Sequence, residues 1–367
     1  MSVHVLHVFS TFASGGPQVR TARLLPELDR SWRHSIVALD GCTDARVLLD
    51  PAARVEIVPA PPRAGTPRTT LALMRLFRRL RPDLLLTYNF GALDALLASR
   101  IAGPRAVVHH EDGFLPDEVH GFKRRREWAR RMVLPRTRAV IVPSFTLEAI
   151  ARERWHLRDG HLRRIANGIR LAGFPARDGN PARRAELGIP ADAVVVGYVG
   201  HLRGEKNPVR LVQAMADVPA QLLMLGDGPE RAHVEDTVRE LGLGSRVHLV
   251  GHRKDPGPDY RVMDVFALPS DTEQMPVALL EAMASALPVA ATDVGDVRRI
   301  LPDEGARFVV PAGAEPGALA RALTALAVDV ELQQRLGRAN RARVEREYSF
   351  ERMAAAFRAV YGAALAH

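Results

Sequence analysis

The sequence predicts an α/β protein of two Rossmann-like domains that face a cleft, and three observations carry this prediction. The chain has 367 residues, more than one ordinary hydrophobic core holds. Each half alternates short apolar runs with longer amphipathic runs, the pattern of βαβ units around a parallel sheet. A stretch rich in Gly, Pro and Asn, residues 167–181, separates the two series and is the best candidate for a linker.

The first series begins with a buried strand over residues 3–10, which a Gly-Gly turn connects to a helix. A second helix is predicted over 68–80, where apolar and arginine residues recur with helical spacing. Further short apolar runs predict the remaining strands of this half, at 34–39, 55–60, 83–88, 106–111 and 139–144.

The second series repeats this order after the linker. Helices are predicted over 208–218 and 230–243, and residues 331–365 are expected to be helical almost throughout. The strands of this half are predicted at 194–200, 221–228, 246–251, 265–270 and 288–293.

Composition predicts a soluble, cytoplasmic protein. Apolar residues make up 47% and charged residues 25%, which is typical of a globular chain. The single cysteine, Cys42, excludes a disulfide framework and a thiolate zinc site. The first residues lack the basic start of a signal peptide, and no apolar run approaches the length of a membrane span.

The positive charge is confined to one half of the chain. The net charge is +9, but residues 1–178 hold 29 basic and 17 acidic residues, a net of +12, which leaves −3 for the remainder. Nucleic acid, an anionic membrane or a phosphorylated substrate would each suit such a half, and so would arginines that only face water. No helix-turn-helix, RRM or zinc pattern is present, so nucleic acid is not expected as a partner.

Three loops that follow predicted strands of the second half carry residues suited to a phosphorylated ligand. Gly200 ends a strand and is followed by Arg203 and Lys206, two cations able to neutralise a diphosphate. Gly226-Asp-Gly228 forms a tight turn after the next strand. In the third loop, residues 270–276 precede a helix whose free backbone N–H groups point back at the loop.

In this order, the three loops resemble the retaining glycosyltransferases of family 4, which have the GT-B fold and use nucleoside-diphosphate sugars. The resemblance rests on GHLRGEK, on LGDGPE and on two glutamates eight residues apart, followed by AMASALPV. It extends to SGGP near the start and to YSFERM near the end, and it is strongest over about 194–300. It implies a C-terminal helix that packs back on the first domain, with domains at 1–175, 176–345 and 346–367.

The resemblance also implies the donor-binding residues. Glu281 would bind the ribose, and Glu273 would hold the donor sugar, while Arg203 and Lys206 would stabilise the departing diphosphate, where negative charge develops. No metal and no other cofactor is expected. The remaining donor-site residues implied are Gly200, Gly226, Gly228, Arg253, Met275, Pro276 and Val277.

The first domain would bind the acceptor, and here the assignment stays open. Gly15 and Gly16 would lie near the acceptor or the diphosphate. The strand end AVVHHEDGF offers either His110 or Asp112 as a catalytic residue, depending on the alignment, although the histidines could simply cap the sheet. Asn89 closes another strand and would contact the acceptor, or would only form a turn.

Some positions depart from the family pattern. His201 stands where an arginine is usual, and Pro276 removes a backbone donor next to the sugar site. Ala286 replaces the glycine that ends the helix after the second glutamate. Because a left-handed conformation costs alanine roughly 1 kcal/mol, a different helix end is expected there.

Two basic amphipathic helices are predicted in the positive half, at 68–81 and 121–136, and they suggest a role for its charge. They would hold the first domain against the inner face of the cell membrane, where a lipid-linked acceptor is embedded. The alternative is that their apolar faces pack on the sheet and only their arginines meet solvent.

Sugar transfer to a glycan or lipid-linked acceptor, in cell-envelope or polysaccharide synthesis, is therefore the leading hypothesis for function. A nucleotide-sugar 2-epimerase of the same fold and a non-catalytic nucleotide-sugar-binding protein are the alternatives. The spacing of Glu273 and Glu281 and the LGDGPE motif favour transfer.

Overall fold

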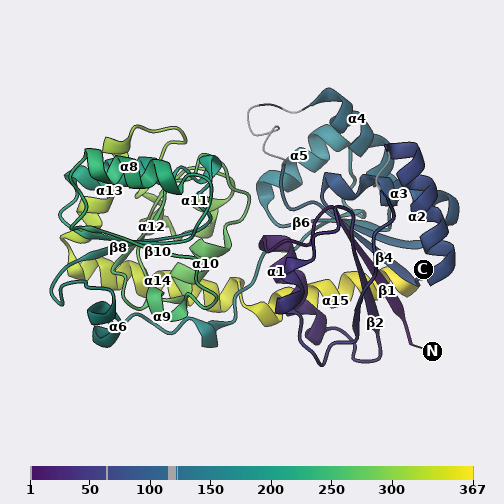
Figure 1. Ribbon diagram of the computed structural model, residues 1–367, viewed down its shortest axis with the longest axis horizontal. Coiled ribbons are helices and arrows are strands. Elements are labelled where there is room, and N and C mark those ends of the chain that lie inside the picture. The colour runs from purple at the N-terminus through teal and green to yellow at the C-terminus, as the bar shows by residue number, and fades with distance from the viewer. Residues whose placement is uncertain (1, 63–64, 115–120, 122, 367) are drawn as a thin grey trace. The chain divides into compact units, whose positions relative to one another are not determined.

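The computed structural model describes the chain except for residues 1, 63–64, 115–120, 122 and 367, and Figure 1 shows that it forms two α/β units. Unit 1 comprises Met1–Asn167 together with Met353–His367, and unit 2 comprises Gly168–Arg352. The domain limits proposed from the sequence, at 175 and 345, lie within eight residues of these limits. The predicted fold class, with two Rossmann-like sheets and a returning C-terminal helix, is confirmed.

Unit 1 is built on a parallel sheet of seven strands in the order β3-β2-β1-β4-β5-β6-β7. All six residues of β1 are buried, because the strand lies between β2 and β4 with both faces covered. This explains why the central strands are continuously apolar and show no alternation. The strands are β1 (His4–Phe9), β2 (Arg33–Ala38), β3 (Val55–Ile57), β4 (Leu84–Tyr88), β5 (Ala106–His110), β6 (Ala139–Val142) and β7 (Leu162–Arg164).

Helices cover both faces of this sheet, as Figure 1 shows. They are α1 (Gly16–Leu24), α2 (Thr66–Leu80), α3 (Leu93–Ala102), α4 (Arg124–Val133), α5 (Phe145–Trp155) and α15 (Phe350–Ala366), and the short helix η1 (Leu25–Glu27) continues α1. The apolar side of α2, which includes Leu73 and Phe77, is buried in the core, and α2 packs against α3. The amphipathic pattern of α2 therefore serves the core, and its arginines face solvent.

The other basic helix, α4, is shorter than predicted and differs from a membrane-surface helix in one respect. Arg130 is completely buried, where it forms ion pairs with Glu111 and Glu127. Its guanidinium also lies over the rings of Phe90 and Trp155, at 4.9 and 5.2 Å. Because its charge is paired inside unit 1, Arg130 is not available to a lipid surface.

Unit 2 holds a parallel six-stranded sheet in the order β10-β9-β8-β11-β12-β13. Because strand order reverses between β8 and β11, the loops after these strands flank a crevice at the carboxyl edge of the sheet. The strands are β8 (Val195–Val199), β9 (Gln221–Leu225), β10 (Val247–Gly251), β11 (Val265–Leu268), β12 (Val289–Thr292) and β13 (Val309–Val310).

The helices of unit 2 alternate with these strands. They are α6 (Pro181–Glu186), α7 (Pro208–Ala214), α8 (Arg231–Glu240), α9 (Gly257–Tyr260), α10 (Val277–Ala284), α11 (Val297–Ile300), α12 (Asp303–Ala306), α13 (Pro316–Ala327) and α14 (Val330–Glu347). The predicted helical stretch 331–365 is interrupted at Ser349, which forms a β-bridge with Ile169. This bridge separates α14 from α15.

The last helix completes the core of unit 1. Phe357 and Tyr361 of α15 are each 1% exposed, and the Tyr361 hydroxyl lies 2.8 Å from Nε2 of His110. The helix α15 thus packs against the carboxyl end of β5, whose His110 lies 251 residues earlier in the sequence. None of the described helices is both long enough and apolar enough to cross a bilayer.

Helix α10 ends in the manner typical of a C-terminal glycine, although the residue is alanine. Ala286 has φ +57°, in the left-handed region, and the N–H of Leu287 donates to the carbonyl of Ala282. The expectation of a different helix end was therefore wrong. The carbonyl of Ala286 is pressed against α14, since a Cβ on Gly337 would lie 2.0 Å from that oxygen, and this packing holds the alanine in its strained conformation.

We expect Ala286→Gly to stabilise unit 2 by about 0.5–1 kcal/mol, because glycine adopts the left-handed conformation without the Cβ penalty. The measurement is the thermal unfolding midpoint of unit 2. The control is Ala342→Gly on the exposed side of α14, also in unit 2, where the same change removes a good helix former and should destabilise by about 1 kcal/mol. A lower midpoint for Ala286→Gly would show that the backbone there is not strained.

Candidate active site

The loops after β8 and β9 are packed backbone against backbone. A Cβ on Gly226 would lie 1.8 Å from the carbonyl oxygen of Gly200, and one on Gly228 would lie 2.4 Å from that of Leu202. Both positions have positive φ, and the N–H of Leu202 donates to Asp227. The glycines are thus required for the loops to meet, and the predicted residues Gly200, Gly226 and Gly228 are brought together.

A pocket of about 140 Å³ opens where these loops meet the end of β10. It joins three predicted donor-site residues, Gly200, Gly226 and Arg253, at the carboxyl edge of the sheet. Arg253 lies 3.9 Å from the buried carboxylate of Asp259, which fixes its side chain beside the pocket. The lining is Val199, Gly200, His201, Leu225, Gly226, His252, Arg253 and Pro256.

His201, which replaces the usual arginine, lines this pocket as an uncharged group. Burial, followed by repulsion from Arg203, lowers the pKa of His201 below its ordinary value. The positive charge that an arginine would bring at position 201 is therefore absent there, and the nearby cations are Arg203 and Lys206. Of these, the side chain of Arg203 is 54% exposed and reaches only Glu205, at 4.0 Å.

Lys206 and Glu273 form an ion pair that joins the first and third loops. Lys206 Nζ lies 2.7 Å from Glu273 Oε1, which also accepts the hydroxyl of Ser270 at 2.9 Å. The glutamate side chain is 9% exposed and the lysine side chain is 30% exposed, so the pair is partly shielded from water. Oε2 of Glu273 has no hydrogen-bond partner among the residues that the structure describes, and it can accept a hydroxyl from a ligand.

The backbone of the third loop is held in place from the next strand connection. A Cβ on Gly295 would lie 2.4 Å from the carbonyl oxygen of Glu273, and the N–H of Asp296 donates to that of Gln274. Met275 is 6% exposed, and Pro276 precedes the first turn of α10, which starts at Val277. The N-terminal N–H groups of α10 therefore lie at the same edge as Lys206.

Glu281 lies within α10, one turn after its first residue Val277, and is 8% exposed. The hydroxyl of Tyr260 donates to its Oε2 at 3.0 Å. Burial, reinforced by the Glu281 carboxylate, raises the pKa of Tyr260 well above its usual value, so the phenol stays protonated and remains a donor. Tyr260 thus orients the glutamate that the family pattern assigns to ribose binding.

In unit 1, predicted residues gather where β1, β4 and β5 end side by side. The N–H of Asp112 donates to Oδ1 of Asn89 at 2.7 Å, and Asn89 has a positive φ of 58°. Arg20 of α1 binds both carboxylate oxygens of Asp112, at 2.5 and 2.8 Å. Both side chains are about one-tenth exposed, so the Arg20–Asp112 pair is largely enclosed at the edge of the sheet.

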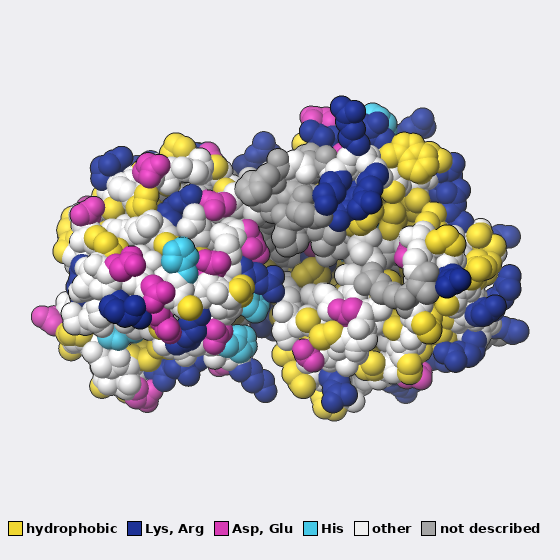
Figure 2. Space-filling view, turned by 45° about the horizontal axis from the view of Figure 1, so that its top comes forward, with side chains coloured by type: hydrophobic (Ala, Val, Ile, Leu, Met, Phe, Trp, Pro, Cys, Tyr) yellow, Lys and Arg dark blue, Asp and Glu magenta, His cyan; other side chains and the backbone are white. Residues whose placement is uncertain are grey.

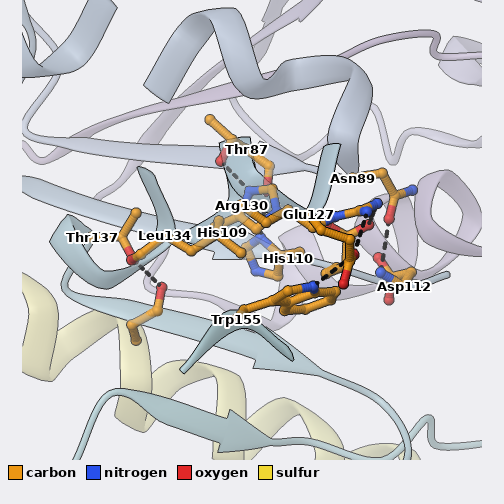
Figure 3. A network of polar contacts seen from close by, with 12 residues as sticks. Thr87, Asn89, His109, His110, Asp112, Glu127, Arg130, Leu134, Thr137 and Trp155 are labelled. Atoms are coloured by element: carbon orange, nitrogen blue, oxygen red, sulfur yellow. Dashed lines mark hydrogen bonds and ion pairs between the residues drawn. The ribbon is translucent and has the colours of Figure 1, made fainter. Parts of the chain in front are cut away.

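His110 is oriented into the interior of the unit, as Figure 3 shows beside Asp112. It is 1% exposed, and its two ring nitrogens lie 3.1 Å from the carbonyl of Thr87 and 2.8 Å from the Tyr361 hydroxyl. Burial lowers the pKa of His110 well below its usual value, and Arg20 adds to the effect. Its neighbour His109 is fully buried between Thr87 and Glu111.

The glycines of the first loop lie at the start of α1. Gly15 precedes the helix, and a Cβ there would approach the Gln18 side chain to 2.9 Å, whereas Gly16 has open space around it. Gly91, after β4, would clash with Ser10 if it carried a Cβ, which presses the loops after β1 and β4 together. The backbone of this region is therefore closely packed around Asn89.

Sequence reasoning missed Arg20, Tyr260 and Tyr361, which orient candidate site residues. Each contacts a residue far away in the chain, and none belongs to a motif. Arg20 is one of 51 basic residues, so its type alone carried no signal.

Family models match most of the chain. Residues 180–343 match the model of glycosyl transferases group 1, and residues 15–168 match the glycosyl transferase 4-like domain. A curated relative is the 2-deoxystreptamine N-acetyl-D-glucosaminyltransferase of Streptomyces fradiae. It is 30% identical over an alignment of 395 positions, gaps included, which covers 93% of this chain and 91% of that protein.

Solved structures share the fold over nearly the whole chain. HepE of Anabaena, solved in complex with UDP-glucose, has a TM-score of 0.81 at 18% identity and covers 99% of both chains. WaaG, a glycosyltransferase involved in lipopolysaccharide biosynthesis, has a TM-score of 0.74 at 16% identity and covers 96% of this chain and 98% of its own.

Two α/β units with a packed glycine turn and a Lys–Glu pair at a strand edge define a GT-B glycosyltransferase. The chain belongs to the group 1 glycosyltransferases, family 4, whose members are retaining hexosyltransferases.

Proposed function

We propose that this enzyme transfers a hexose from a uridine diphosphate sugar to a glycan or lipid-linked acceptor of the cell envelope or of a polysaccharide. The observation that carries the donor half is the pocket formed by Gly200, Gly226 and Arg253 beside the Lys206–Glu273 pair. The UDP-glucose bound to HepE supports the uridine nucleotide. The role of WaaG in lipopolysaccharide biosynthesis supports the acceptor class.

In this proposal the donor is held along the carboxyl edge of unit 2. The base enters the pocket, and Glu281 accepts the ribose hydroxyls with the carboxylate that Tyr260 orients. Glu273 binds a hydroxyl of the sugar with its unpartnered Oε2 while its Oε1 keeps Lys206 in place. Each carboxylate thus binds the ligand while a second bond fixes its orientation.

Departure of the diphosphate is the step that the cations assist. Negative charge grows on the leaving group as the glycosidic bond breaks, so preorganised positive groups stabilise the transition state more than the bound donor. Lys206 supplies a shielded charge, and the N-terminus of α10 supplies backbone donors. Arg203, which is half exposed, supplies a second and weaker charge.

The donor base is tested by the thermal unfolding midpoint in the presence of UDP-, GDP- and ADP-sugars. A ligand present at 100 times its Kd stabilises the folded protein by about 2.7 kcal/mol, and we expect the uridine compounds alone to reach this range. A larger shift with a guanosine or adenosine donor would overturn the uridine assignment. Labelled donor then distinguishes transfer to an acceptor from epimerisation, which alters the sugar on the nucleotide, and from binding without turnover.

In unit 1, we propose that Asp112, rather than His110, acts on the acceptor hydroxyl as the catalytic residue. The Asp112 carboxylate lies at the strand end beside Asn89 and is about one-tenth exposed, whereas His110 is 1% exposed and both its nitrogens face the interior. We expect Asp112→Asn to lower kcat by about 10²-fold, the range of lost acid–base assistance. His110→Gln should mainly lower the unfolding midpoint, because it removes a buried hydrogen bond to the Tyr361 hydroxyl.

Steady-state rates at a temperature where both variants are folded check this assignment. An Asp112→Asn enzyme with full kcat, alongside a folded but inactive His110→Gln enzyme, would transfer the role to His110.

For the membrane, the observation in favour is the outer face of α4. Trp128 and Met132 are 65% and 41% exposed and lie one turn apart, beside the exposed Arg124 and Arg131. Figure 2 shows Lys and Arg side chains crowded along the outer edge of unit 1, around apolar ones. We propose that this face of α4 contacts anionic lipid on the cytoplasmic side of the membrane.

Sedimentation with vesicles that contain phosphatidylglycerol tests the lipid contact. We expect binding at low salt, loss of binding at high salt, and a reduced bound fraction for Trp128→Ser. Val328→Ser is the matched control, since Val328 is 68% exposed but belongs to unit 2. Absence of binding to these vesicles at low salt would exclude the proposal.

A further inference from the structure

Unit 1 contains a second hollow, at the opposite edge of its sheet from Asp112. It has a volume of about 370 Å³, within the range of small-ligand pockets. Its walls come from the end of η1, the amino end of β2 and the segment before β3, so it lies where parallel strands begin. The lining is Leu25, Pro26, Leu28, Asp29, Arg30, Trp32, His34, Asp50, Ala52, Ala53 and Arg54.

Two rings form the inner wall of this hollow. The ring centroids of Trp32 and His34 lie 6.4 Å apart. His34 is 4% exposed, and its Nδ1 is held by Nε2 of His7 at 3.1 Å. Its other nitrogen, Nε2, has no hydrogen-bond partner among the described residues, although the ring lines the hollow. That nitrogen can therefore form a hydrogen bond with water or with a ligand in the hollow.

The protonation state of His34 also suits a hydrogen bond with an uncharged ligand. Burial, followed by repulsion from His4, lowers the pKa of His34 to about 4. The imidazole is therefore neutral at pH 7, and His7 holds it in position. A neutral ring forms a hydrogen bond with a hydroxyl at lower desolvation cost than a charged ring.

Charged groups at the rim complete the hollow. Arg30 and Arg54 are exposed, and neither guanidinium has an ion pair or hydrogen bond among the described residues. Asp29 and Asp50 each use Oδ1 to accept a backbone N–H two residues further on, which orients the carboxylate. The side chain of Ser31 also bonds to Asp29. The rim thus offers planar donors and planar acceptors in equal number, with no net charge.

We propose that this hollow binds one hexopyranose unit of a carbohydrate, outside the site of sugar transfer. A pyranose presents C–H groups on its face, which pack on an aromatic ring, and hydroxyls at its edge, which pair with guanidinium, carboxylate and imidazole groups. The balanced charge disfavours a nucleoside diphosphate, because its phosphates would meet both aspartates. This inference goes beyond the transfer reaction and does not depend on it.

The test uses the full-length protein labelled with 5-fluorotryptophan. The chain has three tryptophans, so ¹⁹F NMR gives three signals, which single substitutions assign. The probes are glucose, galactose and N-acetylglucosamine, each added to about 50 mM, well above a millimolar Kd. We expect at least one probe to shift the Trp32 signal with saturation. The buried Trp155 and the exposed Trp128 serve as internal references.

Variants separate this hollow from other places where a sugar could bind. Arg54→Ala should weaken the titration several-fold, whereas Arg23→Ala, an exposed arginine of α1 outside the hollow, should leave it unchanged. Sorbitol, a polyol without a ring, should leave the Trp32 signal in place. A Trp32 signal that no probe moves, or a titration that Arg54→Ala does not alter, overturns the proposal. Either result leaves the transfer assays unaffected.

Discussion

Lys206→Ala is expected to lower kcat by about 10²–10³-fold, the usual cost of removing one preorganised group from a site of developing charge. Its ammonium lies 2.7 Å from Glu273 Oε1, and its side chain is 30% exposed, against 54% for Arg203, so water screens its charge less. The KM for the donor should change much less than kcat, since the interaction strengthens as the diphosphate departs. Initial rates over a range of donor concentrations give both constants.

Arg203→Ala provides the matched comparison within the same loop. Its side chain is 54% exposed and only loosely paired, so water screens its charge and the loss in kcat should stay below about 10-fold. If the two variants lose activity equally, burial of the charge does not determine its catalytic contribution. If Arg203→Ala loses more, the diphosphate is bound chiefly by the arginine.

Gly226→Ala should have the largest effect on stability, a loss of about 3 kcal/mol or more from the free energy of unfolding of unit 2. The added Cβ would lie 1.8 Å from a backbone carbonyl oxygen, which no side-chain rotation relieves, and the position has φ +141°. The loops after β8 and β9 would have to separate. Nucleotide binding should therefore be lost together with stability.

Gly204→Ala is the control, because it lies in the loop after β8 with ordinary backbone angles and no atom within 4 Å of the new Cβ. Its unfolding midpoint should stay within about 1 °C of the parent, as for a neutral surface change. The midpoints of the two variants, recorded with and without nucleotide, check the prediction. Equal midpoints would mean that the two loops are not packed as described.

The sequence predicted the fold well because the deciding signals are local. The apolar runs at 3–10 and 194–200 are long enough to be central strands, and both became β1 and β8, each flanked by other strands. Their order along the chain then left few topologies, since parallel strands need helical crossovers. The strand-end loops followed from the same reasoning.

The contacts that orient the candidate site could not be predicted in this way. Arg20 and Asp112 are 92 residues apart, and His110 and Tyr361 are 251 apart. Such pairs depend on where helices dock, which periodicity does not specify. The basic helices show the same limit, because an amphipathic pattern reveals an apolar face but not what covers it. In α2 the core covers it, and in α4 even an arginine is buried.

The position of α15 has a consequence for how the protein is made. Unit 1 includes the last residues of the chain, and Phe357 and Tyr361 fill its core, whereas unit 2 is one continuous segment that ends at Arg352. Domains usually fold in order of synthesis, N-terminal first. Here unit 1 emerges from the ribosome first but is incomplete until α15 is made, so unit 2 can become native before it. Until α15 has been translated, the nascent unit 1 exposes the apolar surface that this helix covers, and we expect chaperones to bind it.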